Sequence, residues 1–426
     1  MARASSGAAV KEGRVFYGWW VVTAAFVTTF VGFGCAYTFG AFLAPLQHQF
    51  AASRGTISLI FSLAGFLYFM LGAASGLLAD RFGVRALCAV GACLIAVGMT
   101  GAASARTLPE VLTAYGLGVG LGIGCAYVPA MGAVQRWFSR RRGLASGIAV
   151  SGIGVGTLVM PPVASGLIEG FGWRAAYLIL AAGVAALGII AALVMRDDPR
   201  DMGLKPDGDD TGDSSAAIAD GLGLAGAIRS SPFVYLYIGN LLASVGAFVP
   251  FVHLVPFARN HGIGAQAAVW LVALAGAGSA LARPVLGGLA DRLGRVRLLI
   301  AAVSVMGASL GLWPLAGSFP ALALFAVVFG VACGGWVALL PAWVADLFGR
   351  KHISGIIGAL YTSVAFGTLV GPAAAGFAYD WIGSYRPAIL AAAAVQIMGA
   401  LSIAQSARLA ELKKRAPVHA STRASD

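Results

Sequence analysis

An arginine interrupts one of the most apolar stretches of the sequence. Arg283 follows the uncharged residues 265–282 and precedes a second uncharged run that ends at Asp291. A guanidinium group stays charged and offers two parallel N–H donors to a carboxylate. Because a cation inside a hydrophobic segment is costly, it is by default a candidate functional site. Arg283 is therefore predicted to bind a carboxylate; the alternative is a side chain that extends to the lipid headgroups.

The surroundings of this arginine favour the binding interpretation. No Asp or Glu lies deep within a hydrophobic segment, so the sequence supplies no internal counter-ion. The two halves of the sequence resemble each other, and the position that matches Arg283 in the first half is Gly72, so the repeat does not require a cation. Pro284 follows the arginine directly and loosens the backbone there. A substrate that brings its own negative charge would supply the missing anion.

His253, in the stretch VPFVHLVPFA, is the best candidate for carrying a proton. Histidine is the side chain that changes charge near neutral pH. Helix rise places it roughly 15–20 Å in height from Arg283, so direct contact is not expected. Two interpretations stay open: gating of protons or substrate, and an ordinary interfacial histidine.

The segments that carry these residues are membrane spans. Of 426 residues, 59% are hydrophobic and 11% are charged, whereas soluble domains carry about 25% charged residues. Runs of about 20 apolar residues, enough to cross roughly 30 Å of hydrocarbon, recur along the chain. Twelve spans are predicted, near residues 17–43, 55–79, 85–104, 109–134, 144–168, 173–195, 232–257, 265–289, 297–315, 319–345, 354–378 and 385–406.

The distribution of charge predicts the orientation of these spans. Of 29 Lys and Arg residues, one lies within a span and five fall on one side of the membrane; the rest fall on the other side. This asymmetry follows the positive-inside rule and predicts an inner (plasma) membrane protein with both termini cytoplasmic. The net charge of +12 is thus a topology signal and does not indicate nucleic acid. The five residues predicted outside are Arg54, Arg106, Arg174, Arg259 and Arg386.

The chain contains an internal repeat. GLLADRFGVR at 76–85 returns as GGLADRLGRV at 287–296, and GTLVMPP at 156–162 returns as GTLVGPA at 367–373. An acidic, Gly-rich segment separates the two copies, as a flexible linker would. Two six-helix halves in parallel repeat are typical of secondary transporters. The predicted units are a first half at 1–195, a cytoplasmic linker at 196–231, a second half at 232–407 and a cytoplasmic tail at 408–426.

The repeated loop GLLADRFGVR resembles the signature of the major facilitator superfamily between helices 2 and 3, and its copy lies between helices 8 and 9. The resemblance implies an all-α membrane protein of twelve transmembrane helices in two pseudo-symmetric halves. It also implies a cytoplasmic gate in which the aspartates cap helix ends and the basic residues brace the closed state. The alternative is loop charges set by topology alone. The residues concerned are Gly76, Asp80, Arg81, Arg85, Asp291, Arg292 and Arg295.

Two further stretches resemble the monocarboxylate transporter branch. WFSRRRGLASGIAVSG at 137–152 is similar to its helix 4–5 signature, and YGWWVV at 17–22 resembles its bacterial members, which include oxalate/formate exchangers. Arg283-Pro284 matches an Arg-Pro of helix 8 whose guanidinium binds substrate carboxylate in that family. The chain departs in having Ser279 where animal members have an aspartate, and no second cation in helix 1 or 11. A single cation favours one carboxylate over two.

The resemblance also implies which residues face the substrate and the proton. Helices 1, 8, 10 and 11 line the family's cavity, although plain packing is the alternative for every polar or aromatic residue chosen on that ground. Bacterial members have a histidine placed like His253, thirty residues before the arginine. The candidate lining residues are Tyr37, Ser279, Trp336, Tyr361 and Ser363.

The prediction is a transporter that moves a small monocarboxylate, such as a lactate- or pyruvate-like 2-hydroxy or 2-oxo acid, by alternating access. Proton symport is the first choice. Alternatives are an organic anion exchanger, a drug exporter and a carboxylate sensor that does not transport. The five cysteines form no CxxC pair or Cys/His cluster, and no nucleophile–base arrangement is visible, so no metal, cofactor or enzymatic activity is predicted.

Overall fold

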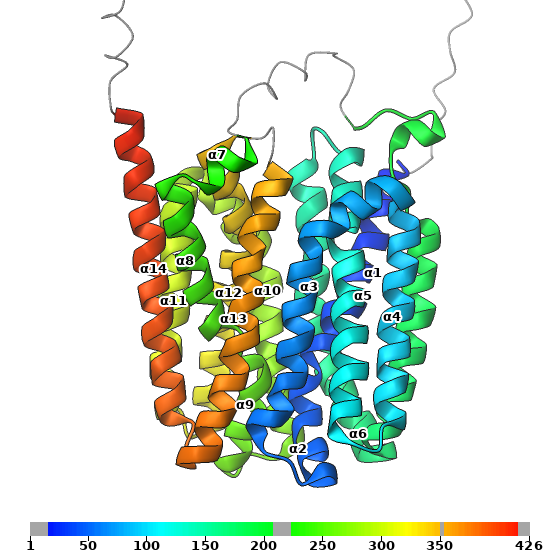
Figure 1. Ribbon diagram of the computed structural model, residues 1–426, viewed down its shortest axis with the longest axis vertical. Coiled ribbons are helices and arrows are strands. Elements are labelled where there is room, and N and C mark those ends of the chain that lie inside the picture. The colour runs from blue at the N-terminus through cyan, green and yellow to red at the C-terminus, as the bar shows by residue number, and fades with distance from the viewer. Residues whose placement is uncertain (1–15, 208–222, 350–352, 416–426) are drawn as a thin grey trace, which may run out of the picture.

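The computed structural model describes residues 16–207, 223–349 and 353–415. Long apolar helices run side by side across the molecule (Figure 1). In chain order the helices are α1 (Gly18–Tyr37), α2 (Phe39–Phe50), α3 (Arg54–Phe82), α4 (Val84–Ser104), α5 (Leu108–Trp137), α6 (Arg142–Val194), η1 (Pro199–Met202), α7 (Leu224–Ile228), α8 (Ser231–Ala247), α9 (Val249–Asn260), α10 (Ala265–Leu293), α11 (Arg295–Leu312), η3 (Trp313–Leu315), α12 (Phe319–Phe348), α13 (Ile353–Ile382) and α14 (Arg386–Arg415).

Eleven helices of the described chain are long and apolar enough to cross a membrane. The longest, Gly143–Val194 within α6, would extend roughly 78 Å as one straight helix, more than twice the thickness of the hydrocarbon. The chain is non-helical at Gly172, where φ is +78°, a conformation that glycine adopts without steric cost. α6 therefore comprises two spans that meet at Gly172. The predicted twelve-span, all-helical membrane fold is confirmed.

The first helix of each half breaks and then continues beyond its predicted end. α1 stops at Tyr37 and α2 continues to Phe50; α8 likewise gives way to α9, which ends at Asn260. The predicted ends followed the fall in hydropathy, whereas α2 and α9 are held by packing against each other. Gly40 permits this approach, because a Cβ there would lie 2.9 Å from the carbonyl oxygen of Phe251.

The spanning helices form two groups, α1–α6 (blue to green) and α8–α14 (green to red), side by side in Figure 1. The main contacts between these two halves join α3 to α13, α6 to α10 and α2 to α9. We call the end that carries residues 195–207 and 223–230 the linker end, and the opposite end, with residues 51–53 and 383–385, the far end. The domain boundaries at residues 195, 231 and 407 stay predictions.

The contacts between α6 and α10 are tight where the two helices cross and open toward the linker end. α6 and α10 cross where a Cβ on Gly154 would lie 2.6 Å from the Cβ of Ala280. Two turns toward the linker end on the same helix faces, Cβ atoms on Gly147 and Gly287 would meet nothing within 4 Å. Gly76, on the linker-end part of α3, is equally open. The facing helices therefore separate toward the linker end.

A polar cluster closes the far end. The carboxylate of Asp380, on α13, accepts hydrogen bonds from the backbone N–H groups of Arg54 (3.0 Å) and Gly55 (2.8 Å) and so caps α3 of the other half. A carboxylate at a helix N-terminus also interacts favourably with the helix dipole. The guanidinium of Arg54 donates to the hydroxyl of Tyr385 (2.9 Å) and the side-chain oxygen of Asn260 (3.1 Å). We call Arg54, Asn260, Asp380 and Tyr385 the far-end latch.

Asp380→Asn should loosen the far end while the bundle stays folded. The amide keeps the size of the side chain but weakens two charge-assisted bonds to the first turn of α3. We expect the backbone amides of residues 54–58 to exchange with deuterium roughly tenfold faster, as measured by mass spectrometry.

Glu110→Gln is the matched control, because the carboxylate of Glu110 accepts from the backbone N–H of Arg106 (2.7 Å) within one half. It should leave exchange at residues 54–58 unchanged. Unchanged exchange in Asp380→Asn as well would show that the latch does not hold the two halves together.

Candidate functional site

A cavity of about 690 Å³ lies between the two halves. Five of the six predicted substrate residues line it, although they come from four helices: α1, α10, α12 and α13. The helix crossings described above bring these helices together, since α6 contacts α10 and α3 contacts α13. The lining residues predicted from the sequence are Tyr37, Ser279, Arg283, Trp336 and Tyr361.

Arg283 is the charged centre of this cavity, with only 5% of its surface exposed. Its Nη1 donates to the carbonyl oxygen of Val150 on α6, and its Nη2 donates to the hydroxyl of Ser279 (3.3 Å). The Nε–H group is buried without a partner. These contacts place the guanidinium between the halves and not at a lipid headgroup. Donors therefore remain for a ligand, because a guanidinium has five N–H groups.

The described part of the chain places no compensating anion in the cavity. Among the described residues, no Asp or Glu is buried or lines the cavity. A buried cation normally pairs with an anion, since an unpaired charge in an apolar site is strongly destabilised. The carbonyl of Val150 and the hydroxyl of Ser279 supply only partial negative charge. A bidentate carboxylate would complete the hydrogen bonding of Arg283 and neutralise its charge.

Aromatic rings line the cavity over its whole height. Tyr37 and Phe251, from opposite halves, stack with ring centroids 4.4 Å apart and planes inclined by 25°. Tyr37 lies nineteen residues from the linker end of α1, and Arg283 lies ten from the linker end of α10. At 1.5 Å per residue, roughly 13 Å separates the heights of their Cα atoms, and because α1 and α10 run in opposite directions the two side chains lean toward each other. Tyr127 lies ten residues from the linker end of α5, and Tyr361 lies eight from that of α13, so aromatic rings also line the cavity at the height of Arg283.

Ser363 does not line the cavity, because its side chain is engaged behind the wall. The side-chain amide of Asn240 donates to the hydroxyl of Ser363 (2.8 Å), and the indole N–H of Trp336 donates to the side-chain oxygen of Asn240 (3.0 Å). The chain from Ser363 through Asn240 fixes the orientation of Trp336. Asn240 was not predicted; a lone amide in the apolar run YLYIGNLLASV was the available signal.

His253 is fully buried at the far end and does not line the cavity. Its Nδ1 lies 3.1 Å from the hydroxyl of Tyr385, and its Nε2 lies 2.8 Å from the carbonyl oxygen of Pro372. A carbonyl only accepts, so Nε2 carries the proton. Burial raises the pKa of Tyr385, which stays a phenol, accepts from Arg54 and donates to Nδ1. These hydrogen bonds suit a neutral imidazole that is joined to the far-end latch.

The residues of the predicted cytoplasmic gate lie at the linker end. Arg85 donates to the carbonyl oxygens of Leu193 (2.8 Å) and Met195 (3.4 Å), and Arg295 pairs with Asp346 (2.6 Å). Each of these interactions stays within one half. Three further gate residues have exposed side chains, and the side chain of Asp291 lies outside the described part of the structure. The exposed residues are Asp80, Arg81 and Arg292.

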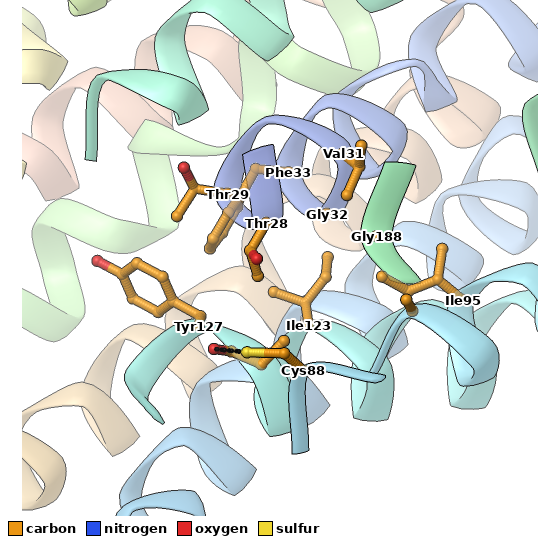
Figure 2. Close-up of a pocket in the computed structure, with 12 residues that line it drawn as sticks. Thr28, Thr29, Val31, Gly32, Phe33, Cys88, Ile95, Ile123, Tyr127 and Gly188 are labelled. Carbon is orange, nitrogen blue, oxygen red and sulfur yellow. Dashed lines mark hydrogen bonds between the residues drawn. The ribbon is translucent and has the colours of Figure 1, made fainter. Parts of the chain in front are cut away.

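A second, smaller cavity of about 330 Å³ lies within the first half, between α1, α4, α5 and α6 (Figure 2). Its polar side chains bond to backbone carbonyls: Thr29 to Ala149 (2.7 Å), and Cys88, more weakly, to Ala126 (3.9 Å). No charged residue lines it among the described residues. It is a gap in helix packing, and the cavity at Arg283 is the functional candidate.

Comparison with known proteins agrees with this architecture. Residues 24–267 and 236–423 match the family model of the Major Facilitator Superfamily. Mouse monocarboxylate transporter 11 is 31% identical over 90% of this chain and 86% of its own length. Rat monocarboxylate transporter 12 is 28% identical over 94% of this chain and 87% of its own length.

A solved structure shows the same fold. It is a bacterial homologue of the human lysosomal transporter Spinster, in an inward-facing and unoccupied conformation. The two structures align with a TM-score of 0.66 and 18% sequence identity, over 95% of this chain and 98% of the other. At this identity the likeness shows the fold alone. Together with the family model and the transporter relatives, it establishes that this chain belongs to the major facilitator superfamily, in its monocarboxylate transporter branch.

Proposed function

We propose that this protein is a secondary active transporter of a small organic monocarboxylate, in which Arg283 binds the carboxylate. A lactate- or pyruvate-like acid is the minimal substrate. The observation that carries the proposal is the buried guanidinium on a cavity between the halves, with an unpartnered Nε–H and no anion beside it among the residues that the structure describes. The similarity to proteins named monocarboxylate transporters supports the same substrate class.

Binding at Arg283 would be linked to movement of the two halves. The Nη1 group of Arg283, on α10, donates to the carbonyl of Val150, on α6, so one hydrogen bond crosses from half to half. A carboxylate that takes this donor replaces a contact between the halves with a contact to substrate. When the carboxylate replaces Val150 at this donor, the substrate interacts differently with the inward-open and outward-open conformations. A ligand can shift the balance between two conformations only if it interacts with them differently.

The linker end would be the cytoplasmic end, as the positive-inside rule predicts. In the structure the far end is closed by the latch and the helices are apart at the linker end, so the cavity would face the cytoplasm. Closing the linker end would bring the exposed side chains of Asp80, Arg81 and Arg292 toward neighbouring helix ends. That is the bracing role that these residues would have in this family.

Proton coupling would act through the far-end latch and not through the substrate site. In the neutral state, His253 accepts from Tyr385, which in turn accepts from Arg54. Protonation of Nδ1 would turn this acceptor into a donor, force the hydroxyl of Tyr385 to reorient and add positive charge near Arg54. The closed far end would thereby weaken, so a proton from outside would favour opening to the outside.

Counterflow in proteoliposomes tests the proposed transport directly. Vesicles loaded with unlabelled pyruvate or lactate should accumulate the labelled acid transiently, whereas vesicles loaded with the uncharged amide of the same acid should not. If no labelled monocarboxylate exchanges in either direction, the transport proposal fails. Exchange that persists without any response to a proton gradient would instead identify an anion exchanger.

Arg283→Lys should reduce uptake by about tenfold to a hundredfold, the range expected for losing a charged hydrogen bond. Lysine keeps the positive charge but loses the planar two-pronged geometry. Arg283→Ala should transport no better. The measurement is initial uptake rate per mole of reconstituted, folded protein.

Arg174→Lys is the matched control, because Arg174 also donates to backbone carbonyls, those of Ala103 and Ala105 (2.8 Å each), but lies at the far end and does not line the cavity. It should keep most of the uptake. If Arg283→Ala takes up the acid at the wild-type rate, Arg283 does not bind the substrate.

His253→Gln should abolish uphill uptake driven by an inward proton gradient but preserve downhill exchange. Glutamine can still donate to the carbonyl of Pro372 but cannot titrate. Uptake would be measured at outside pH 5.5 and 7.5 with the membrane potential clamped. His261→Gln is the control, since His261 directly follows α9 and its side chain donates to the nearby carbonyl of Phe257 (2.9 Å). Full pH stimulation in His253→Gln would mean that the residue carries no proton.

A further inference from the structure

We infer that the preferred substrate is an aryl-bearing 2-oxo or 2-hydroxy monocarboxylate without an amino group. The inference rests on the proposed function, in that it takes Arg283 as the carboxylate site, and it specifies the remainder of the substrate. Three features of the cavity carry it: the aromatic content of its wall, its length, and the absence of an anion beside it.

The wall of the cavity is built to contact a ring. Eight of its seventeen lining residues are aromatic, far more than a three-carbon acid could contact. Tyr37 and Phe251 already stack in the offset geometry that aromatic pairs prefer. The N–H group of Trp336 is engaged with Asn240, so this indole offers the cavity its apolar surface. An aryl group of the substrate would remove these surfaces from water.

The length of the cavity also exceeds what a minimal acid requires. Roughly 13 Å separates the heights of the Cα atoms of Arg283 and Tyr37 along the bundle. Pyruvate and lactate contain only two carbon–carbon bonds, each of about 1.5 Å. A three-carbon acid held by its carboxylate on Arg283 therefore leaves much of the aromatic wall without a contact.

The charge of the cavity excludes an amino group on the substrate. Arg283 is the only Lys, Arg, His, Asp or Glu among its described lining residues. The ammonium group of an aromatic amino acid would lie close to the same guanidinium, with no carboxylate of the protein to pair with it. A 2-oxo or 2-hydroxy group carries no charge and can share the hydrogen-bonding region of Ser279.

Calorimetric titration of the full chain in nanodiscs tests the inference on the wild-type protein. The probes are pyruvate and phenylpyruvate, lactate and 3-phenyllactate, and phenylalanine. We expect each aryl acid to bind at least about tenfold more tightly than its three-carbon partner, since even one methylene in an apolar pocket changes affinity by that order. Equal dissociation constants within a pair would overturn the inference, as would phenylalanine binding as tightly as phenylpyruvate.

A variant that fills part of the cavity provides an independent test. Cys333 lines the cavity between the heights of Arg283 and Tyr37. Cys333→Phe should lower the ratio of phenylpyruvate to pyruvate affinity roughly tenfold. Cys333→Ser, which adds no volume, should keep the wild-type ratio. An unchanged ratio in a Cys333→Phe protein with a normal melting temperature would overturn the inference.

The outcomes separate this inference from the proposed function. If none of the acids binds, the proposal that Arg283 accepts a carboxylate fails. If pyruvate and lactate bind as well as their aryl partners, that proposal survives and the aryl inference alone falls. The wild-type comparison does not depend on either Cys333 variant, so a variant that misfolds leaves the test intact.

Discussion

The positive charge of Arg283 constrains the whole architecture. A guanidinium that is removed from water and given no anion is costly, so the surrounding structure has to reduce that cost without neutralising the charge. It does so with a carbonyl from α6 and a hydroxyl from its own helix. The carbonyl of Val150 comes within reach because Gly154 and Gly276 allow α6 and α10 to cross backbone to backbone. Small residues at this crossing are therefore part of the site.

The two ends of the molecule are built differently around this centre. At the far end, charged and hydrogen-bonded side chains join the halves directly, with Asp380 capping a helix of the other half. At the linker end, the corresponding helix faces do not touch, and the salt bridge of Arg295 with Asp346 and the bonds of Arg85 remain within their halves. Polar contacts that join the halves at one end, with looser packing of the helices at the other, are the arrangement that alternating access requires of each conformation.

Much of this architecture could be predicted from the sequence. Long apolar runs determine the membrane spans. An arginine within such a run is conspicuous, because burying its charge costs free energy, so a buried position for Arg283 between helices could be predicted from the sequence. The contacts that depend on tertiary placement were not. Asn240 is uncharged and gives a weak signal in a hydrophobic run, although it fixes Trp336. Asp380 and Arg54 lie 326 positions apart, and nothing local indicates that they meet.

The extent of α2 and α9 was underestimated for a related reason. Hydropathy falls before either helix ends, but packing between the halves continues the helices to Phe50 and Asn260. Ser363 shows the opposite error, since a polar residue on a cavity-facing helix was expected to reach the cavity and instead bonds to Asn240 behind the wall. The length of α2 and α9 and the direction of the Ser363 side chain are both set by contacts with a neighbouring helix.

The most direct measurement compares the binding of an acid and its nearly isosteric amide, pyruvate and pyruvamide, to the wild-type protein and to Arg283→Ala. If Arg283 recognises negative charge, the wild-type protein should bind the acid at least about tenfold more tightly than the amide, and the variant should bind the two alike. Discrimination between acid and amide that survives the loss of Arg283, or that is absent from the wild-type protein, would contradict the assignment of this residue as the carboxylate site.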